Sequence, residues 1–162
     1  MPSETFTDAI ALLKADHREV EELFEKFESA RSSAKQAIAE QICNELKIHA
    51  TIEEEIFYPA FKAAGEKSDD AMMYFEAMEE HRAAGDLVLP DLLKTPTESE
   101  KFSGRAKVLK ELVEHHAGEE EKSMFKRAKQ LMDSAELKEL GEKLEARKLE
   151  LLEQLKAEAP AA

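Results

Sequence analysis

The stretch LKIHATIEEEIFYP, from Leu46 to Pro59, decides the fold of this chain. His49 and Glu53 lie four positions apart in it, with isoleucines beside them at helical spacing. Residues four apart share one face of a helix, so the imidazole and the carboxylate point the same way. The stretch therefore predicts an amphipathic helix whose inner face carries two side chains able to bind a metal ion.

Histidines recur in the other helical stretches. His17 and His81 each share a helix face with apolar residues at helical spacing, and His116 with Glu120 repeats the four-residue spacing. Four neutral imidazoles and two carboxylates that converge on one interior suit a pair of transition-metal ions. We therefore predict a metal site built from His17, His49, Glu53, His81, His116 and Glu120.

A structural role is the alternative for each of these residues, because a single histidine on an apolar face is more often part of the packing than a ligand. The six residues taken together favour metal binding over a structural role. Burial of these groups without partners would cost several kcal/mol per ion and about 1–3 kcal/mol per unpaired polar group. A metal pair removes that cost, so ligation is the preferred interpretation.

The position of His115 relative to the predicted site is ambiguous. His115 with Glu119 competes with His116 and Glu120, but His116 shares its face with apolar residues such as Leu112. We expect His115 either to support the site from outside or to be exposed.

Tyr58 points away from His49 if the helix is straight, whereas a disturbance at Pro59 would turn the phenol toward the site. An exposed position at the rim is the preferred interpretation for Tyr58. Tyr58 and His115 are therefore candidates for an extra ligand or a supporting contact.

Capping and turn signals divide the chain into five helices. The expected starts are Thr7 or Asp8, residue 34, Ser68 or Asp69, Thr97 with Glu100, and Asp133–Ser134. Gly65 should end the second helix, and Pro90 should bend or end the third. Short connections make neighbouring helices antiparallel. The predicted fold is all-α: an up-down-up-down four-helix bundle over residues 1–132, with an accessory helix and tail over residues 133–162.

Composition limits the partners. The chain has 162 residues, a formal net charge of −13 and one cysteine. Nucleic acid and anionic membrane surfaces both attract clustered Lys and Arg, so neither is expected as a partner. No secretory signal and no membrane span is visible, which favours a cytoplasmic protein. Leucines repeat along the last helix and should cover the bundle or form a homodimer interface.

Four segments carry a resemblance to a known family. They are KADHREV from Lys14, LKIHATIEEEIFYP from Leu46, EHR from Glu80 and VEHHAGEEEKSMF from Val113. Together they resemble the hemerythrin family, specifically the HHE cation-binding domains, over about residues 8–130. The resemblance implies an antiparallel four-helix bundle that holds two iron ions as an oxo- or hydroxo-bridged centre. It also implies that His17, His49, His81 and His116 are terminal ligands and that Glu53 and Glu120 bridge the irons.

The chain departs from the oxygen-carrying hemerythrins, which place two histidines four apart on the third helix. Ala77 and Gly85 stand four residues before and after His81 and cannot ligate. This departure disfavours reversible dioxygen carriage and favours reaction with small oxidants, hydrogen peroxide breakdown of a catalase- or peroxidase-like kind above all. The alternatives are a module that binds or senses dioxygen, nitric oxide or iron without turnover, and a metal-free interaction bundle.

Overall fold

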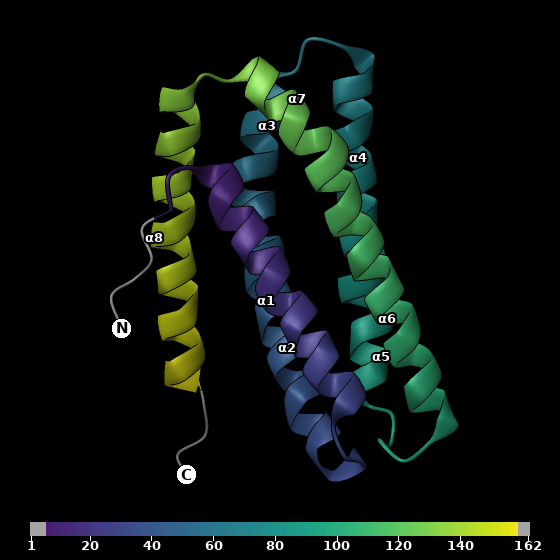
Figure 1. The fold of residues 1–162 in the computed structure, drawn as a ribbon. Coiled ribbons are helices and arrows are strands. Elements are labelled where there is room, and N and C mark those ends of the chain that lie inside the picture. The colour runs from purple at the N-terminus through teal and green to yellow at the C-terminus, as the bar shows by residue number, and fades with distance from the viewer. Residues whose placement is uncertain (1–5, 159–162) are drawn as a thin grey trace.

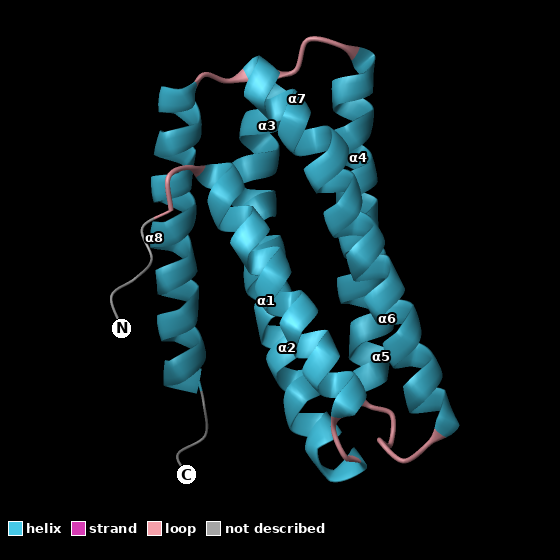
Figure 2. Ribbon diagram, viewed as in Figure 1, coloured by secondary structure: helices cyan, strands magenta, loops and turns pink. Residues whose placement is uncertain are grey.

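The computed structural model describes residues 6–158. Within this range every regular element is helical, which confirms the all-helical prediction (Figure 2). The elements are α1 (Ala9–Ser29), α2 (Ser32–Ile52), η1 (Glu53–Phe57), α3 (Tyr58–Ala64), α4 (Ser68–His81), η2 (Arg82–Val88), α5 (Leu89–Leu93), α6 (Glu100–Glu119), η3 (Glu120–Met124), α7 (Phe125–Leu131) and α8 (Ser134–Glu158).

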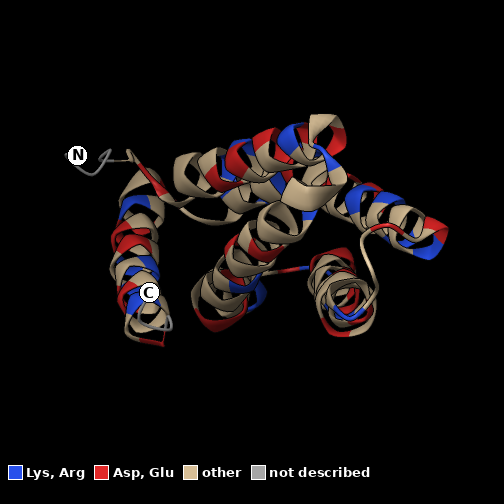
Figure 3. Cartoon of the chain, turned by 90° about the horizontal axis from the view of Figure 1, so that it is seen from below, with Lys and Arg blue, Asp and Glu red and all other residues tan. Residues whose placement is uncertain are grey.

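Successive helical runs reverse direction along the chain (Figure 1). The run from α2 through η1 to α3 packs against α1, and the run from α4 through η2 to α5 lies beside α6. The last helix, α8, packs against α1, α2 and η1. Acidic and basic residues are interspersed along the helices (Figure 3). None of the helices in residues 6–158 is long and apolar enough to cross a membrane.

Three of the segments, η1, η2 and η3, are π-helical turns within longer helices. Two of them precede prolines: η1 contains the residue four before Pro59, and η2 the residue four before Pro90. A proline displaces the carbonyl group four residues back, and a π turn is one way in which a helix absorbs that change. The expected loosening at Pro59 therefore takes the form of a π turn. The third helix does not end at Pro90 but continues to Leu93.

The helix caps agree with the sequence only in part. Asp8 caps α1 as expected, since its Oδ1 accepts a hydrogen bond from the Ala11 N–H at 2.9 Å. Ser99 rather than Thr97 caps α6, with its Oγ 3.2 Å from the Phe102 N–H. The difference is two residues, and several short polar side chains compete for this cap.

α4 begins at Ser68, one of the two expected starts, but the capping carboxylate comes from Asp70, the third residue of the helix, and not from Ser68 or Asp69. Asp70 Oδ2 accepts hydrogen bonds from the backbone N–H groups of residues 66 and 67, at 2.9 and 3.0 Å. Its carboxylate also pairs with Arg127 of α7, whose Nε lies 2.7 Å from Asp70 Oδ1. The pair with Arg127 holds the Asp70 carboxylate beside these two backbone N–H groups.

The core forms two apolar clusters, which lie on either side of one buried polar layer. One contains Phe57, Phe61 and Leu144, and the other contains Phe24 and Phe102. Leu144 is fully buried, so this part of the leucine stripe of α8 covers the chain's own core. The polar layer between the clusters carries the candidate site.

Candidate metal centre

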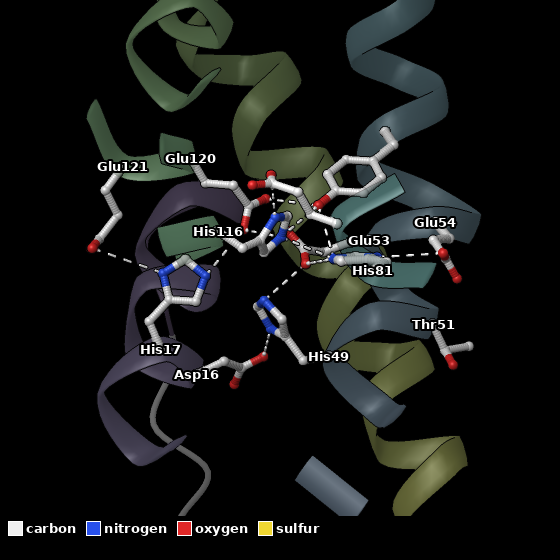
Figure 4. Close-up of polar contacts among 12 residues, drawn as sticks. Asp16, His17, His49, Thr51, Glu53, Glu54, His81, His116, Glu120 and Glu121 are labelled. Atoms are coloured by element: carbon white, nitrogen blue, oxygen red, sulfur yellow. Dashed lines mark hydrogen bonds and ion pairs between the residues drawn. The ribbon is translucent and has the colours of Figure 1, made fainter. Parts of the chain in front are cut away.

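The structure brings the six residues of the predicted site together (Figure 4). α1 contributes His17, the α2–η1 run contributes His49 and Glu53, α4 contributes His81, and the α6–η3 run contributes His116 and Glu120. Five of them are buried, and the His81 side chain is only 8% exposed. Residues up to 103 positions apart in the chain thus converge in one layer of the bundle.

The six residues form two triads, each with ligand atoms within 4.8 Å of one another. The first triad is His17, His49 and Glu120, and the second is Glu53, His81 and His116. Each triad takes its residues from three different helical runs. Every imidazole directs Nε2 at a glutamate, so the nitrogen lone pairs face the centre.

Each glutamate reaches imidazoles of both triads. Glu53 Oε1 lies 2.9 Å from His49 Nε2 and 3.3 Å from His81 Nε2. Glu120 Oε1 lies 3.0 Å from His116 Nε2 and 3.3 Å from His17 Nε2. Two ligand atoms that are each about 2.1 Å from one ion, at right angles, lie about 3 Å apart. The spacing therefore suits shared carboxylates between two ions.

Several buried polar atoms of this layer are not satisfied by hydrogen bonds. Six buried side-chain atoms of the described residues have no partner in hydrogen-bond geometry, although imidazole–carboxylate contacts of 2.9–3.3 Å join several of them: His17 Nδ1 and Nε2, His49 Nε2, Glu53 Oε1 and Oε2, and Glu120 Oε1. All six belong to the predicted site. Unpaired buried polar atoms are rare and costly, about 1–3 kcal/mol each. The residues present thus fit a metal centre better than they fit one another.

Tyr58 contradicts the expectation of an exposed rim position. It is fully buried, and its hydroxyl donates a hydrogen bond to Glu120 Oε2 at 3.0 Å. The same oxygen lies 3.1 Å from His81 Nε2 and 3.2 Å from His116 Nε2. The π turn of η1 precedes Tyr58 and rotates it inward, which a straight-helix projection of the sequence does not show.

Carboxylates support the outer nitrogens of three imidazoles. His49 Nδ1 lies 2.9 Å from Asp16 Oδ2, His116 Nδ1 lies 3.0 Å from Glu80 Oε1, and His81 Nδ1 lies 3.4 Å from Glu54 Oε1. A carboxylate that accepts the Nδ1–H fixes the tautomer and leaves Nε2 free to bind a metal. Such pairs are typical of histidines that ligate metals.

The sequence analysis missed these three acids. Glu54 is exposed and still reaches His81 Nδ1, and Glu80 directly precedes His81 in the chain. Glu80 does point away from its neighbour, toward His116 on another helix. Asp16 adjoins His17 but supports His49. Adjacency to a ligand was the only available signal, because the partner in each case lies on a different helix.

Lys148 links α8 to the site. Its Nζ lies 2.5 Å from Asp16 Oδ1, while Asp16 Oδ2 contacts His49. The chain of contacts therefore runs from the accessory helix through one carboxylate to a predicted ligand. His115 lies further out: its side chain is 61% exposed, and its Nε2 is 3.2 Å from Glu80 Oε2.

In the metal-free site the pKa values of two imidazoles, those of His116 and His49, are raised, which favours their protonated forms. Burial opposes the charge on His116, but Glu120 and Glu80 prevail and raise its pKa to about 10. Burial likewise opposes protonation of His49, yet Glu53 and Asp16 raise its pKa well above the usual value. Metal binding must displace such protons.

The pKa of Tyr58 is raised as well, and here burial acts in the same direction as Glu53 and Glu120: all three hold the pKa of its phenol well above the ordinary value. The phenol is therefore neutral and keeps a proton at its oxygen.

A cavity of about 350 Å³ adjoins the imidazoles. It lies between α1, α2, η2 and α6, and all four predicted histidine ligands line one part of its wall. Phe24 and Leu112 contribute apolar wall surface. The predicted metal layer is therefore accessible to a small molecule.

Comparisons with known proteins agree with this geometry. The family model of the hemerythrin HHE cation binding domain matches residues 8–128. The uncharacterized protein Rv2633c of Mycobacterium tuberculosis is 32% identical over 143 residues, which cover 86% of this chain and 84% of that protein. A DNA nickase of Nostoc sp. is 24% identical over 93% of this chain but only 42% of its own length.

A solved structure is also similar. The crystal structure of a hemerythrin HHE cation binding domain-containing protein, the Rv2633c homolog from Mycobacterium kansasii, has 31% sequence identity and a TM-score of 0.79. The match covers 94% of each chain. It therefore includes α8 as well as the helices that carry the site.

Proposed function

The chain belongs to the hemerythrin HHE cation-binding domain family, and from this premise we propose that it is a non-haem di-iron protein that breaks down hydrogen peroxide. The proposed ligands are His17, His49, His81 and His116, with Glu53 and Glu120 shared between the two ions. One observation carries the proposal: every buried side-chain nitrogen or oxygen of the described residues that has no partner in hydrogen-bond geometry belongs to this set.

The ligand types support iron. Imidazole and carboxylate together suit iron, and six protein ligands for two ions leave positions open for exogenous molecules. The carboxylates are arranged for sharing, since each approaches imidazoles of both triads. Bound in this layer, two irons supply electron transfer and polarisation of an oxygen substrate.

The protein's own groups orient the site and handle protons. Asp16, Glu80 and Glu54 fix the direction of three imidazoles through their Nδ1 atoms. Tyr58 keeps its proton next to Glu120 and can donate it to an oxygen atom that leaves the cleaved O–O bond. The buried aromatic residues around the layer exclude bulk water from the centre.

Iron loading followed by elemental analysis and a near-ultraviolet spectrum tests the metal assignment. Two irons per chain with a charge-transfer band are expected. Dioxygen release from hydrogen peroxide, measured with an electrode, then tests the reaction, in which two peroxide molecules give two waters and one dioxygen.

His81→Ala should reduce both iron content and dioxygen release, because it removes one imidazole of the second triad. Glu79→Gln is the matched control, since Glu79 lies on the same helix, is exposed and pairs with Arg82 outside the site. Equal turnover by wild type and His81→Ala would remove the enzymatic proposal. Tight binding of nitric oxide or dioxygen with no turnover would favour the alternative of a binding or sensing module.

A further inference from the structure

The cavity beside the metal layer is larger than hydrogen peroxide requires. A water molecule takes about 30 Å³ in the liquid, and a molecule with two oxygen atoms takes about twice that volume. The cavity has about 350 Å³, which lies within the range of small-molecule binding pockets. Most of this space therefore has no role in the proposed reaction with hydrogen peroxide.

The wall of the cavity is apolar over most of its surface. Beyond the histidines it includes Val20, Phe24, Leu46, Leu89, Leu112 and Val113. Burial of methylene groups against such a wall is favourable, because it removes apolar surface from water. The cavity thus combines a reactive polar end with a wall suited to an aliphatic chain.

Charged residues at the cavity select against anions. Among its exposed lining residues are the acids Glu21, Asp86 and Glu114, with Lys47 as the basic exception. The excess of acids disfavours a carboxylate at the opening and leaves an uncharged ligand unaffected. The chain's overall charge of −13 acts in the same direction.

We propose that the cavity binds the chain of an uncharged linear alkyl hydroperoxide, with the hydroperoxide group at the end lined by His17, His49 and His81. This proposal rests on the proposed peroxide-degrading function and names a second substrate for the same site. The alkyl hydroperoxide accepts two electrons and two protons, so its O–O bond breaks and it leaves as an alcohol and water. Hydrogen peroxide gives up two electrons and two protons and leaves as dioxygen.

Gly85 provides a way to fill the cavity by mutation. It lines the cavity, and a Cβ atom added there would meet no atom within 4 Å. Gly85→Leu should therefore occupy the cavity with little strain on its neighbours. Gly104→Leu is the matched control, because Gly104 is also helical with open space around it but does not line the cavity.

Binding is measured on the metal-free protein by NMR titration with 1-octanol, an unreactive analogue of octyl hydroperoxide. Wild type and Gly104→Leu should bind 1-octanol equally, and Gly85→Leu at least tenfold more weakly. Octanoate should bind wild type at least tenfold more weakly than 1-octanol, a comparison that requires no variant. Absence of 1-octanol binding to wild type, or equal binding by octanoate, would overturn the proposal.

Turnover is measured on the iron-loaded protein with hydrogen peroxide in the presence of octyl hydroperoxide. One 1-octanol should form for each dioxygen released by the mixed reaction. Dioxygen release from hydrogen peroxide without any 1-octanol would overturn the second substrate alone. Binding of 1-octanol with no peroxide turnover at all would remove the proposed function and leave the cavity as a binding site for aliphatic molecules.

Discussion

Tyr58 is the residue whose position depends most on its surroundings. Its phenol lies within 3.2 Å of three residues of the predicted site, although the sequence favoured an exposed position. Burial and the two site glutamates keep it protonated. The residue is therefore suited to hold a proton beside the centre.

Tyr58→Phe should retain the fold and the iron content but lower the rate of peroxide breakdown by about 10²-fold, as expected for loss of a general acid. The phenyl ring keeps the packing, and only the hydroxyl contacts are lost. Steady-state dioxygen release with iron analysis of the same samples measures the effect. Tyr74→Phe serves as the control, since Tyr74 packs against Tyr58 through its ring. An unchanged rate for Tyr58→Phe would exclude a role for its proton.

At the scale of single elements, α8 is connected to the site by charge and by close packing. Lys148 contacts Asp16, which in turn contacts His49. Gly141 of α8 faces the start of α1 so closely that an added Cβ would lie 2.8 Å from Ala9 N. The accessory helix therefore has a defined register against α1.

Lys148→Met should weaken iron binding by about 10-fold, within the range seen when outer partners of metal ligands are changed. Loss of the ammonium group leaves Asp16 less restrained and His49 less well oriented. Iron release to a chelator measures the effect, and Lys148→Arg should restore much of the affinity. Lys143→Met is the control, because Lys143 is exposed and pairs only with Glu139 among the described residues. Identical release from Lys148→Met and wild type would show that α8 does not support the site.

Gly141→Ala should lower the free energy of unfolding by about 1–3 kcal/mol, as overpacking at a close contact does. The new methyl group would collide with the backbone of Asp8 and Ala9, which cannot rotate away. Urea denaturation measures the change. Gly104→Ala should instead raise the stability by about 0.5–1 kcal/mol, since its helix position is open. Equal stability of the two variants would contradict the close register of α8.

At the scale of the whole molecule, stability and metal binding are coupled through protons. His116 has a pKa of about 10 in the folded metal-free protein, above its ordinary value of 6.5. Its protonation therefore contributes stability that is fully present below pH 6.5 and is lost as the pH rises toward 10. Iron competes with these protons, so its stabilising effect should grow over the same interval.

The urea midpoint of the metal-free protein should accordingly fall between pH 6.5 and 8.5, while the difference between iron-loaded and metal-free protein increases. His116→Gln should show a shallower fall in its metal-free form, because it cannot bind the proton. Midpoints measured at several pH values with and without chelator test this. A flat midpoint for metal-free wild type would contradict the charge arrangement at the site.

Sequence by itself determined the helices and the six residues that they bring together. Helical periodicity and the four-residue spacing are local properties, so His49 with Glu53 and His116 with Glu120 could be assigned to inner faces. Even the local predictions had limits. Steps of three residues from Phe75 to Met78 and His81 indicate a shared inner face, but Phe75 is 59% exposed, because α4 turns Ala77 rather than Phe75 toward the core.

Only the tertiary structure decided how that site is supported. The inward turn of Tyr58, the pairing of Glu80 with His116, the contact of Lys148 with Asp16 and the cavity beside the histidines all depend on π turns and on the register between helices. These features join residues far apart in the chain. Their geometry is set by packing among whole helices, for which no short stretch of sequence carries a signal.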